Sequence, residues 1–156
     1  MNIRRAKEKD IERLMELLGQ VLQIHADIRP DIFIPGTTKY TKDELAEMIK
    51  DDTKPIYVAV DEKDDCLGYA FCQLRKQPFS ENMIPFTALF IDDLCVDAKT
   101  RGQHIGEHLF EYVKEEAKRL GCYEVTLNVW AGNTSAEIFY EKMGLKTKER
   151  QMEYIL

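Results

Sequence analysis

The sequence lacks any apolar run long enough to cross a membrane, and its first ten residues are too charged for a signal peptide. No membrane partner is therefore predicted, and the expected location is cytoplasmic. Histidines and cysteines are also few, with three and four among 156 residues, and no C-x-x-C pair occurs. The spacing predicts no metal site, and the cysteines are expected to be reduced thiols, mostly packed in the core.

An excess of positive charge is absent as well. The 22 Lys and Arg residues stand against 28 Asp and Glu residues, which gives a formal net charge of −6. A protein that binds a nucleic-acid backbone needs cations for the phosphates, so no nucleic-acid partner is predicted. A cationic small molecule or a basic peptide is compatible with this charge.

The chain length and an apolar share of 44% predict one domain, residues 1–156, with a proper core. Short apolar runs predict strands, and apolar residues at steps of three and four predict helices. Strands are expected over residues 2–6, 56–60, 66–75, 88–96, 124–130 and 145–155. Helices are expected over residues 11–22, 43–50 and 105–120, with a short fourth helix between Asn133 and Gly144.

Two segments fit neither pattern. Residues 24–40 contain two prolines and two aromatics, Phe33 and Tyr40, and could form either a connecting loop or a wall of a substrate pocket. Residues 76–85 form a second irregular loop.

The chain is organised around residues 94–106, where an apolar strand ends, a polar loop follows and an amphipathic helix begins. The loop carries Gly102 and Gly106. Free N–H groups at a helix start suit a phosphate, and glycines let the backbone approach it closely. The G-x-G-x-x-G and Walker A patterns do not fit, so the residues leave open a pyrophosphate loop of another kind or an ordinary strand-to-helix turn.

Two motifs give this order of elements a family resemblance. They are R-x-x-x-x-G at residues 101–106 and N-x-x-A-x-x-F-Y-x-x-x-G-L at residues 133–145. With them, the chain resembles the GNAT superfamily of N-acetyltransferases. The resemblance implies an α/β GNAT fold with a mixed central sheet of about six to seven strands, about four flanking helices, and splayed strands at the acetyl-CoA site. Residues 91–96 followed by Arg101 look most like the diamine (polyamine) branch.

The resemblance implies acetyl-CoA as co-substrate and an amine as acceptor, with no metal. In the family, backbone N–H groups of the loop hold the CoA pyrophosphate, and pantetheine pairs with the preceding strand like an added strand. Carried over to this chain, the cofactor-binding residues are Leu94, Cys95, Val96, Arg101, Gly102, Gln103, His104, Ile105, Gly106, Asn133, Ala136 and Tyr140. His104 departs from the family pattern, which has glycine there, and could fit only with a negative φ or at a cost in strain.

The same resemblance suggests the catalytic residues. Tyr140 matches the family tyrosine near the CoA sulfur and is predicted to protonate the leaving thiolate. Asp92 is the favoured base, acting through water, with Asp93 or water alone as alternatives. In a regular strand these adjacent carboxylates would point to opposite faces. The Cys95 side chain is interpreted as core rather than as a nucleophile.

The predicted function is transfer of the acetyl group to a primary amine of a small molecule by direct attack in a ternary complex. One alternative is an acceptor on a peptide or protein, at its N-terminus or at a lysine. Another is a non-catalytic sensor that binds acyl-CoA. The apolar C-terminal run, residues 152–156, would permit a homodimer.

Overall fold

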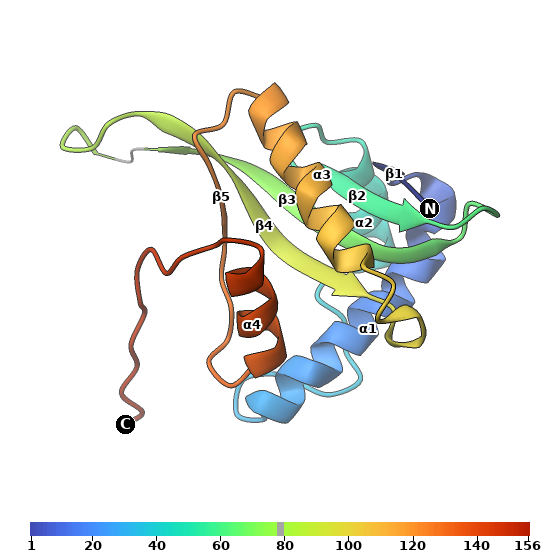
Figure 1. Ribbon diagram of the computed structural model, residues 1–156. Coiled ribbons are helices and arrows are strands. Elements are labelled where there is room, and N and C mark those ends of the chain that lie inside the picture. The colour runs from blue at the N-terminus through green and yellow to red at the C-terminus, as the bar shows by residue number, and fades with distance from the viewer. Residues whose placement is uncertain (78–79) are drawn as a thin grey trace.

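The computed structural model describes residues 1–77 and 80–156 of the chain. Its core is one mixed sheet with the strand order β1-β2-β3-β4-β5 (Figure 1). The strands are β1 (Asn2–Arg5), β2 (Ile56–Val60), β3 (Cys66–Gln77), β4 (Phe86–Val96) and β5 (Glu124–Leu127). β1 to β4 pair antiparallel, and β5 pairs parallel to β4.

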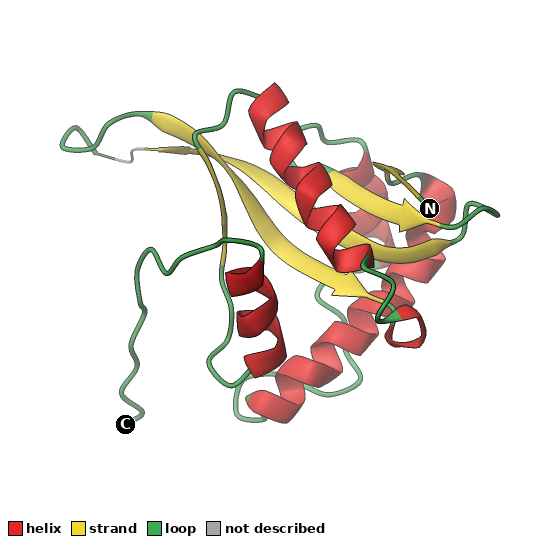
Figure 2. Cartoon of the chain, in the orientation of Figure 1, coloured by secondary structure: helices red, strands yellow, loops and turns green. Residues whose placement is uncertain are grey.

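Helices cover both faces of this sheet (Figure 2). α1 (Ile11–Ile28) and α2 (Lys42–Ile49) pack on one face, and α3 (Ile105–Arg119) packs on the other. α4 (Thr134–Lys142) adds Phe139 to the α3 side. Two short 3-10 turns, Glu8–Asp10 and Ala98–Thr100, precede α1 and α3. Each face therefore has its own apolar cluster, and the sheet stands between them.

The first helix is longer than predicted, since it continues to Ile28 instead of ending near residue 22. Buried side chains recur along it as far as Ala26, so its apolar stripe continues beyond the predicted end. The helix ends where Arg29 precedes Pro30, because a residue before proline is pushed out of the helical conformation. The second helix and its capping box at Thr41 and Glu44 are confirmed.

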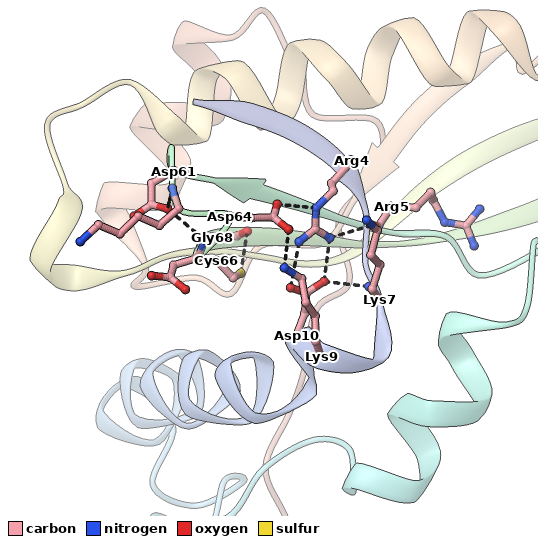
Figure 3. A network of polar contacts seen from close by, with 11 residues as sticks. Arg4, Arg5, Lys7, Lys9, Asp10, Asp61, Asp64, Cys66 and Gly68 are labelled. Atoms are coloured by element: carbon pink, nitrogen blue, oxygen red, sulfur yellow. Dashed lines mark hydrogen bonds and ion pairs between the residues drawn. The ribbon is translucent and has the colours of Figure 1, made fainter.

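An ion-pair network fixes the start of the chain against the β2–β3 turn (Figure 3). Arg4 donates to Asp10 at 2.8 Å and to Asp64 at 2.9 Å. Asp10 is only 3% exposed and also accepts from the Lys7 backbone N–H. Its carboxylate makes no capping hydrogen bond to α1 and instead accepts from the Arg4 guanidinium.

The predicted sheet was too large. Residues 145–156, all within the described part of the chain, form no helix or strand, so the predicted strand over 145–155 is wrong. The strand predicted over 124–130 ends at Leu127. Residues 146–151 are all polar, so this stretch offers no apolar face for a sheet to bury, and β5 is the last strand of the described sheet. The tail is linked to the body by ion pairs of Glu153 with Arg29 and of Lys148 with Glu124, and its side chains Met152, Tyr154, Ile155 and Leu156 are exposed.

The strand–helix–strand crossover formed by β4, α3 and β5 is confirmed. Gly121 follows α3 with a positive φ of 74°, as a helix stop should. The loop predicted over 76–85 begins later, after Gln77, and residues 78–79 of it lie outside the described residues. Among the described residues, no helix is long and apolar enough to cross a membrane.

Candidate active site

A β-bulge in β4 places the two candidate carboxylates. Phe71 of β3 pairs with Asp93, while the next residue, Cys72, pairs with Ile91, so Asp92 is an extra residue in the ladder. The extra residue interrupts the alternation of faces. Both carboxylates accept hydrogen bonds from tyrosines that pack on the α1 side of the sheet. The expectation that they point to opposite faces therefore fails, because the strand is not regular at this point.

Two tyrosines and one lysine contact these carboxylates. The Tyr40 hydroxyl donates to Asp92 Oδ2 at 2.5 Å, and Lys39 Nζ lies 2.8 Å from Asp92 Oδ1. The Tyr69 hydroxyl donates to Asp93 Oδ2 at 2.7 Å. The Phe71 ring lies between the tyrosine rings, stacked on Tyr40 at 5.6 Å and edge-on to Tyr69 at 4.7 Å. The α1–α2 segment, which the sequence left undecided, thus contributes directly to the carboxylate site.

Burial shifts the proton affinities at this site. It raises the pKa of Asp93 from 3.8 to about 6, against the opposing effect of the Tyr69 hydrogen bond. Burial also raises the pKa of the Tyr140 phenol well above its ordinary value, and the negative charge of Asp93 adds to that shift. The phenol therefore keeps its proton at neutral pH, as a proton donor must.

The β4 strand has an open edge next to this pair. Its parallel ladder with β5 covers only residues 88–91 of β4, whereas its antiparallel ladder with β3 continues to Val96. β4 and β5 then diverge (Figure 1). Beyond Ile91, the edge of β4 that faces away from β3 can accept an extended ligand by strand addition.

The loop after β4 is held in place from α1. Asp97 is 4% exposed and accepts from Arg13 and from Gln20 Nε2, the latter at 3.2 Å. Gln20 also accepts from the Ala98 backbone N–H at 3.1 Å. A loop fixed in this way presents its backbone N–H groups in a set geometry, which lowers the entropy cost of binding an anion.

Two residues of the loop have left-handed backbone conformations. Gly102 has φ +84°, and His104 has φ +58° immediately before α3 begins at Ile105. A glycine tolerates this conformation at no steric cost, while a histidine there is uncommon and strained by about 1 kcal/mol. Of the two ways in which His104 could fit the loop, the strained one is the one observed.

The first turn of α3 is packed against α4. A Cβ built on Gly106 would lie 3.3 Å from the Phe139 ring, so this position has little room for a side chain. Glu107 would repel an anion at the helix start, but Lys142 Nζ lies 2.6 Å from its carboxylate and His104 Nδ1 lies 3.2 Å away. The Lys142 ammonium offsets its charge.

The start of α4 is capped as the sequence predicted. The Asn133 side chain accepts from the Ala136 backbone N–H at 3.4 Å. On the same helix Phe139 joins the core cluster on the α3 side, while its neighbour Tyr140 senses Asp93. Adjacent helix positions point in different directions, so Phe139 can pack in the core while the Tyr140 phenol is left for another contact.

The cysteines and histidines provide no rival chemistry among the described residues. Cys95 is buried, and burial raises the pKa of its thiol to about 12, so it stays protonated and unreactive. Within residues 1–77 and 80–156 no three His, Cys, Asp or Glu side chains are grouped so that they could hold a metal ion.

Comparison with known proteins decides the family. Residues 19–145 match the model of the acetyltransferase (GNAT) family, which spans both motifs, the open edge and the carboxylate pair. The chain belongs to the GNAT family. It is thus an acetyltransferase of the GNAT kind, and enzymes of this family use acetyl-CoA. The five-stranded mixed sheet with four helices is the GNAT fold, with one or two strands fewer than predicted.

Three GNAT relatives show how broad the similarity is. The chain is 28% identical over 96% of its length, and 86% of the relative, to the peptidyl-lysine N-acetyltransferase YjaB of Salmonella typhimurium. It is 37% identical to the glucosamine 6-phosphate N-acetyltransferase of Arabidopsis thaliana, but over only 40% of either chain. A crystal structure of a mutant BH1408 protein from Bacillus halodurans superposes with a TM-score of 0.94, at 29% identity, over 100% of this chain and 99% of that one.

Sequence reasoning missed three polar residues of this GNAT site, namely Lys39, Tyr40 and Tyr69. In the sequence, Tyr40 was notable only as an aromatic residue in an irregular segment. Tyr69 has the pattern of an ordinary core residue of its strand. Trp130, three residues after β5, lies 5.3 Å from the Phe33 ring, which makes it part of the contact between the α1–α2 segment and the chain that follows β5.

Proposed function

We propose that this GNAT protein transfers the acetyl group of acetyl-CoA to the primary amine of a small molecule, by direct attack in a ternary complex. One observation carries the proposal. The bulge in β4 sets Asp92 and Asp93 side by side, next to the open edge of the same strand and within the electrostatic reach of Tyr140. The proposed site then combines a carboxylate that binds a cation, a strand edge that binds the thioester and a side chain that donates a proton.

The chain supplies two binding elements for acetyl-CoA in this proposal. The open edge from Leu94 through Cys95 to Val96 would pair with pantetheine, and the backbone N–H groups of residues 101–106 would hold the pyrophosphate. Asn133 and Ala136 at the start of α4 would contact the pantetheine arm from the other side. All of these contacts use backbone atoms or cap atoms, so they leave the side chains free to pack.

Three side chains would handle the protons. Asp92 holds the acceptor ammonium and passes its proton to water, since an aspartate is a weak base toward an ammonium. The free amine then attacks the thioester carbonyl carbon, and the carbon–sulfur bond breaks. Tyr140 donates its proton to the departing thiolate, for which its raised pKa keeps it ready. Asp93 is the alternative base, and its pKa of about 6 suits proton transfer near neutral pH.

A lysine side chain of a peptide or protein is the second candidate acceptor. One observation favours it, because the ammonium of Lys39 already pairs with Asp92 at 2.8 Å, so a lysine can reach this carboxylate. The relative that matches nearly the whole chain is named a peptidyl-lysine N-acetyltransferase. That name describes the acceptor of the relative. The experiment below distinguishes a small amine from a peptide lysine as the acceptor of this chain.

The test measures CoA release from acetyl-CoA with a panel of amines. The panel holds polyamines, glucosamine 6-phosphate, amino acids, aminoglycosides and lysine-containing peptides. Saturable turnover with a small amine would support the proposal, and turnover with peptides alone would move the acceptor to the second class. Tight acetyl-CoA binding without turnover on any amine would contradict the proposal and favour a non-catalytic acyl-CoA sensor.

We also propose that residues 1–156 act as one acetyltransferase domain and that the protein forms a homodimer through its C-terminal segment. Four apolar side chains of that segment are exposed in the single chain, and such a cluster favours association. Gel filtration of the full chain and of residues 1–145 tests this. A monomer in both cases would contradict the dimer.

A further inference from the structure

Lys39 occupies the position that the proposed function assigns to an acceptor. Its Nζ lies 2.8 Å from Asp92 Oδ1 and 5.7 Å from the centre of the Tyr40 ring. Its charge also acts on Asp93, the carboxylate that raises the pKa of Tyr140. A primary amine of the chain itself is therefore in contact with one carboxylate of the pair that the proposed function assigns to the acceptor.

We propose that Lys39 is a modification site, acetylated by its own active site from acetyl-CoA. This inference rests on the proposed function, since it needs acetyl-CoA bound along the open edge of β4. The reaction occurs within one molecule, because Lys39 and the carboxylates belong to the same chain and are already in contact.

The bond changes follow those of the proposed reaction. The Lys39 ammonium loses one proton to water through Asp92, and its nitrogen attacks the thioester carbonyl carbon of acetyl-CoA. The new carbon–nitrogen bond forms an amide as the nitrogen loses its second proton to water, the carbon–sulfur bond breaks, and the CoA thiolate takes a proton from Tyr140. Water then returns a proton to Tyr140. The products are acetyl-lysine and CoA, and nothing is oxidised or reduced.

Acetylation would change the site that performs it. The amide carries no charge and cannot form the ion pair with Asp92. The carboxylate is then free to hold the ammonium of an external amine. In the unmodified protein, Lys39 competes with that amine for Asp92.

The chain contains a matched control lysine. Lys114 on α3 is ion-paired to Glu111 at 2.9 Å and is 35% exposed, compared with 47% for Lys39. Both lysines are thus half-exposed and paired to a carboxylate. Uncatalysed acetylation by acetyl-CoA should therefore proceed at similar rates on both lysines. Of the two, only Lys39 is paired to a carboxylate next to the β4 edge, so only Lys39 should be acetylated by the active site.

The experiment incubates the full chain with acetyl-CoA and follows both lysines by peptide mass spectrometry. We expect Lys39 to be acetylated at least about tenfold faster than Lys114, with a first-order rate constant that does not depend on protein concentration. In Tyr140→Phe the Lys39 rate should fall by about 100-fold or more, while the Lys114 rate stays the same. Lys39→Arg should lose the fast phase of acetyl incorporation.

Equal rates at the two lysines, a Lys39 rate that rises with protein concentration, or a Lys39 rate unchanged in Tyr140→Phe would each overturn the inference. The same samples are assayed for acetyl-CoA binding and for turnover of the amine panel. Turnover of a free amine with Lys39 unmodified overturns the inference and leaves the proposed function standing. Failure to bind acetyl-CoA overturns both.

Discussion

Replacing Asp93 with asparagine removes the one carboxyl of the site whose proton affinity is raised by burial. The pKa of Asp93 rises from 3.8 to about 6 on folding. At about 1.4 kcal/mol per pKa unit, ionised Asp93 destabilises the folded state by up to about 3 kcal/mol. Asparagine has no charge to bury, and its amide oxygen can still accept the hydrogen bond of Tyr69.

The sign of the effect fixes its pH dependence. Because the folded pKa lies above the unfolded one, the wild-type protein loses stability relative to the variant as pH rises from 3.8 through 6. Above that window the variant should be more stable by up to about 3 kcal/mol, or roughly 6–12 °C in melting temperature for a chain of this size. At pH 5 the advantage should be about half as large.

Thermal unfolding of the wild-type protein and the Asp93→Asn variant at pH 5 and pH 8 measures this difference in stability. Groups that titrate alike in both proteins contribute equally to both, so they do not affect the difference. Asp64→Asn is the matched control, because its ion pairs with Arg4 and Lys9 hold the pKa of Asp64 at about 2. That variant should lose stability at pH 8, the opposite sign. An Asp93→Asn variant no more stable than wild type at pH 8, or one with the same advantage at both pH values, would refute the reasoning.

Three further substitutions test other parts of the structure. Tyr140→Phe should lower turnover by about 10²–10⁴-fold with acetyl-CoA affinity little changed, and unchanged turnover would remove Tyr140 from the acid role. Gly106→Trp should abolish acetyl-CoA binding in calorimetry, because a Cβ at this position already lies 3.3 Å from the Phe139 ring and the Trp side chain must displace the loop or α4. Normal binding would contradict our assignment of the loop. Arg4→Met leaves the buried Asp10 carboxylate without its cationic partner, so the free energy of unfolding measured in urea should fall by about 3 kcal/mol. A loss below about 1 kcal/mol would show that Arg4 is dispensable.

Local patterns predicted most of the fold because each was consistent with its neighbours. The apolar stripe of α3, the cap at Asn133 and the capping box at Thr41 all lie where their residues indicate. The tail was the exception. Its apolar residues are Leu145 and a cluster within 152–156, with six polar residues between them. A strand also needs hydrogen-bond partners from another strand, and a pattern of residues does not show whether one is present.

The resemblance to the family suggested Asp92, Asp93 and Tyr140 as site residues, and their roles stay predictions. In the structure the two aspartates are neighbours at the bulge, and the charge of Asp93 acts on the Tyr140 phenol. The resemblance could not identify Lys39 or Tyr40, because their contact with Asp92 joins residues 53 and 52 positions apart in the chain. The α1–α2 segment has no periodic pattern from which such a contact could be inferred.

The extra residue in β4 also affects how related chains should be aligned. Across the bulge, the face of the sheet to which a side chain points depends on the number of residues in the strand as well as on their identities. An extra residue in β3 between Phe71 and Cys72 would give Asp92 a partner, return β4 to regular alternation and send one carboxylate to the α3 side. Two relatives could thus share both aspartates and still differ in chemistry, so an alignment insertion between Phe71 and Cys72 would signal a different site even where every motif is intact.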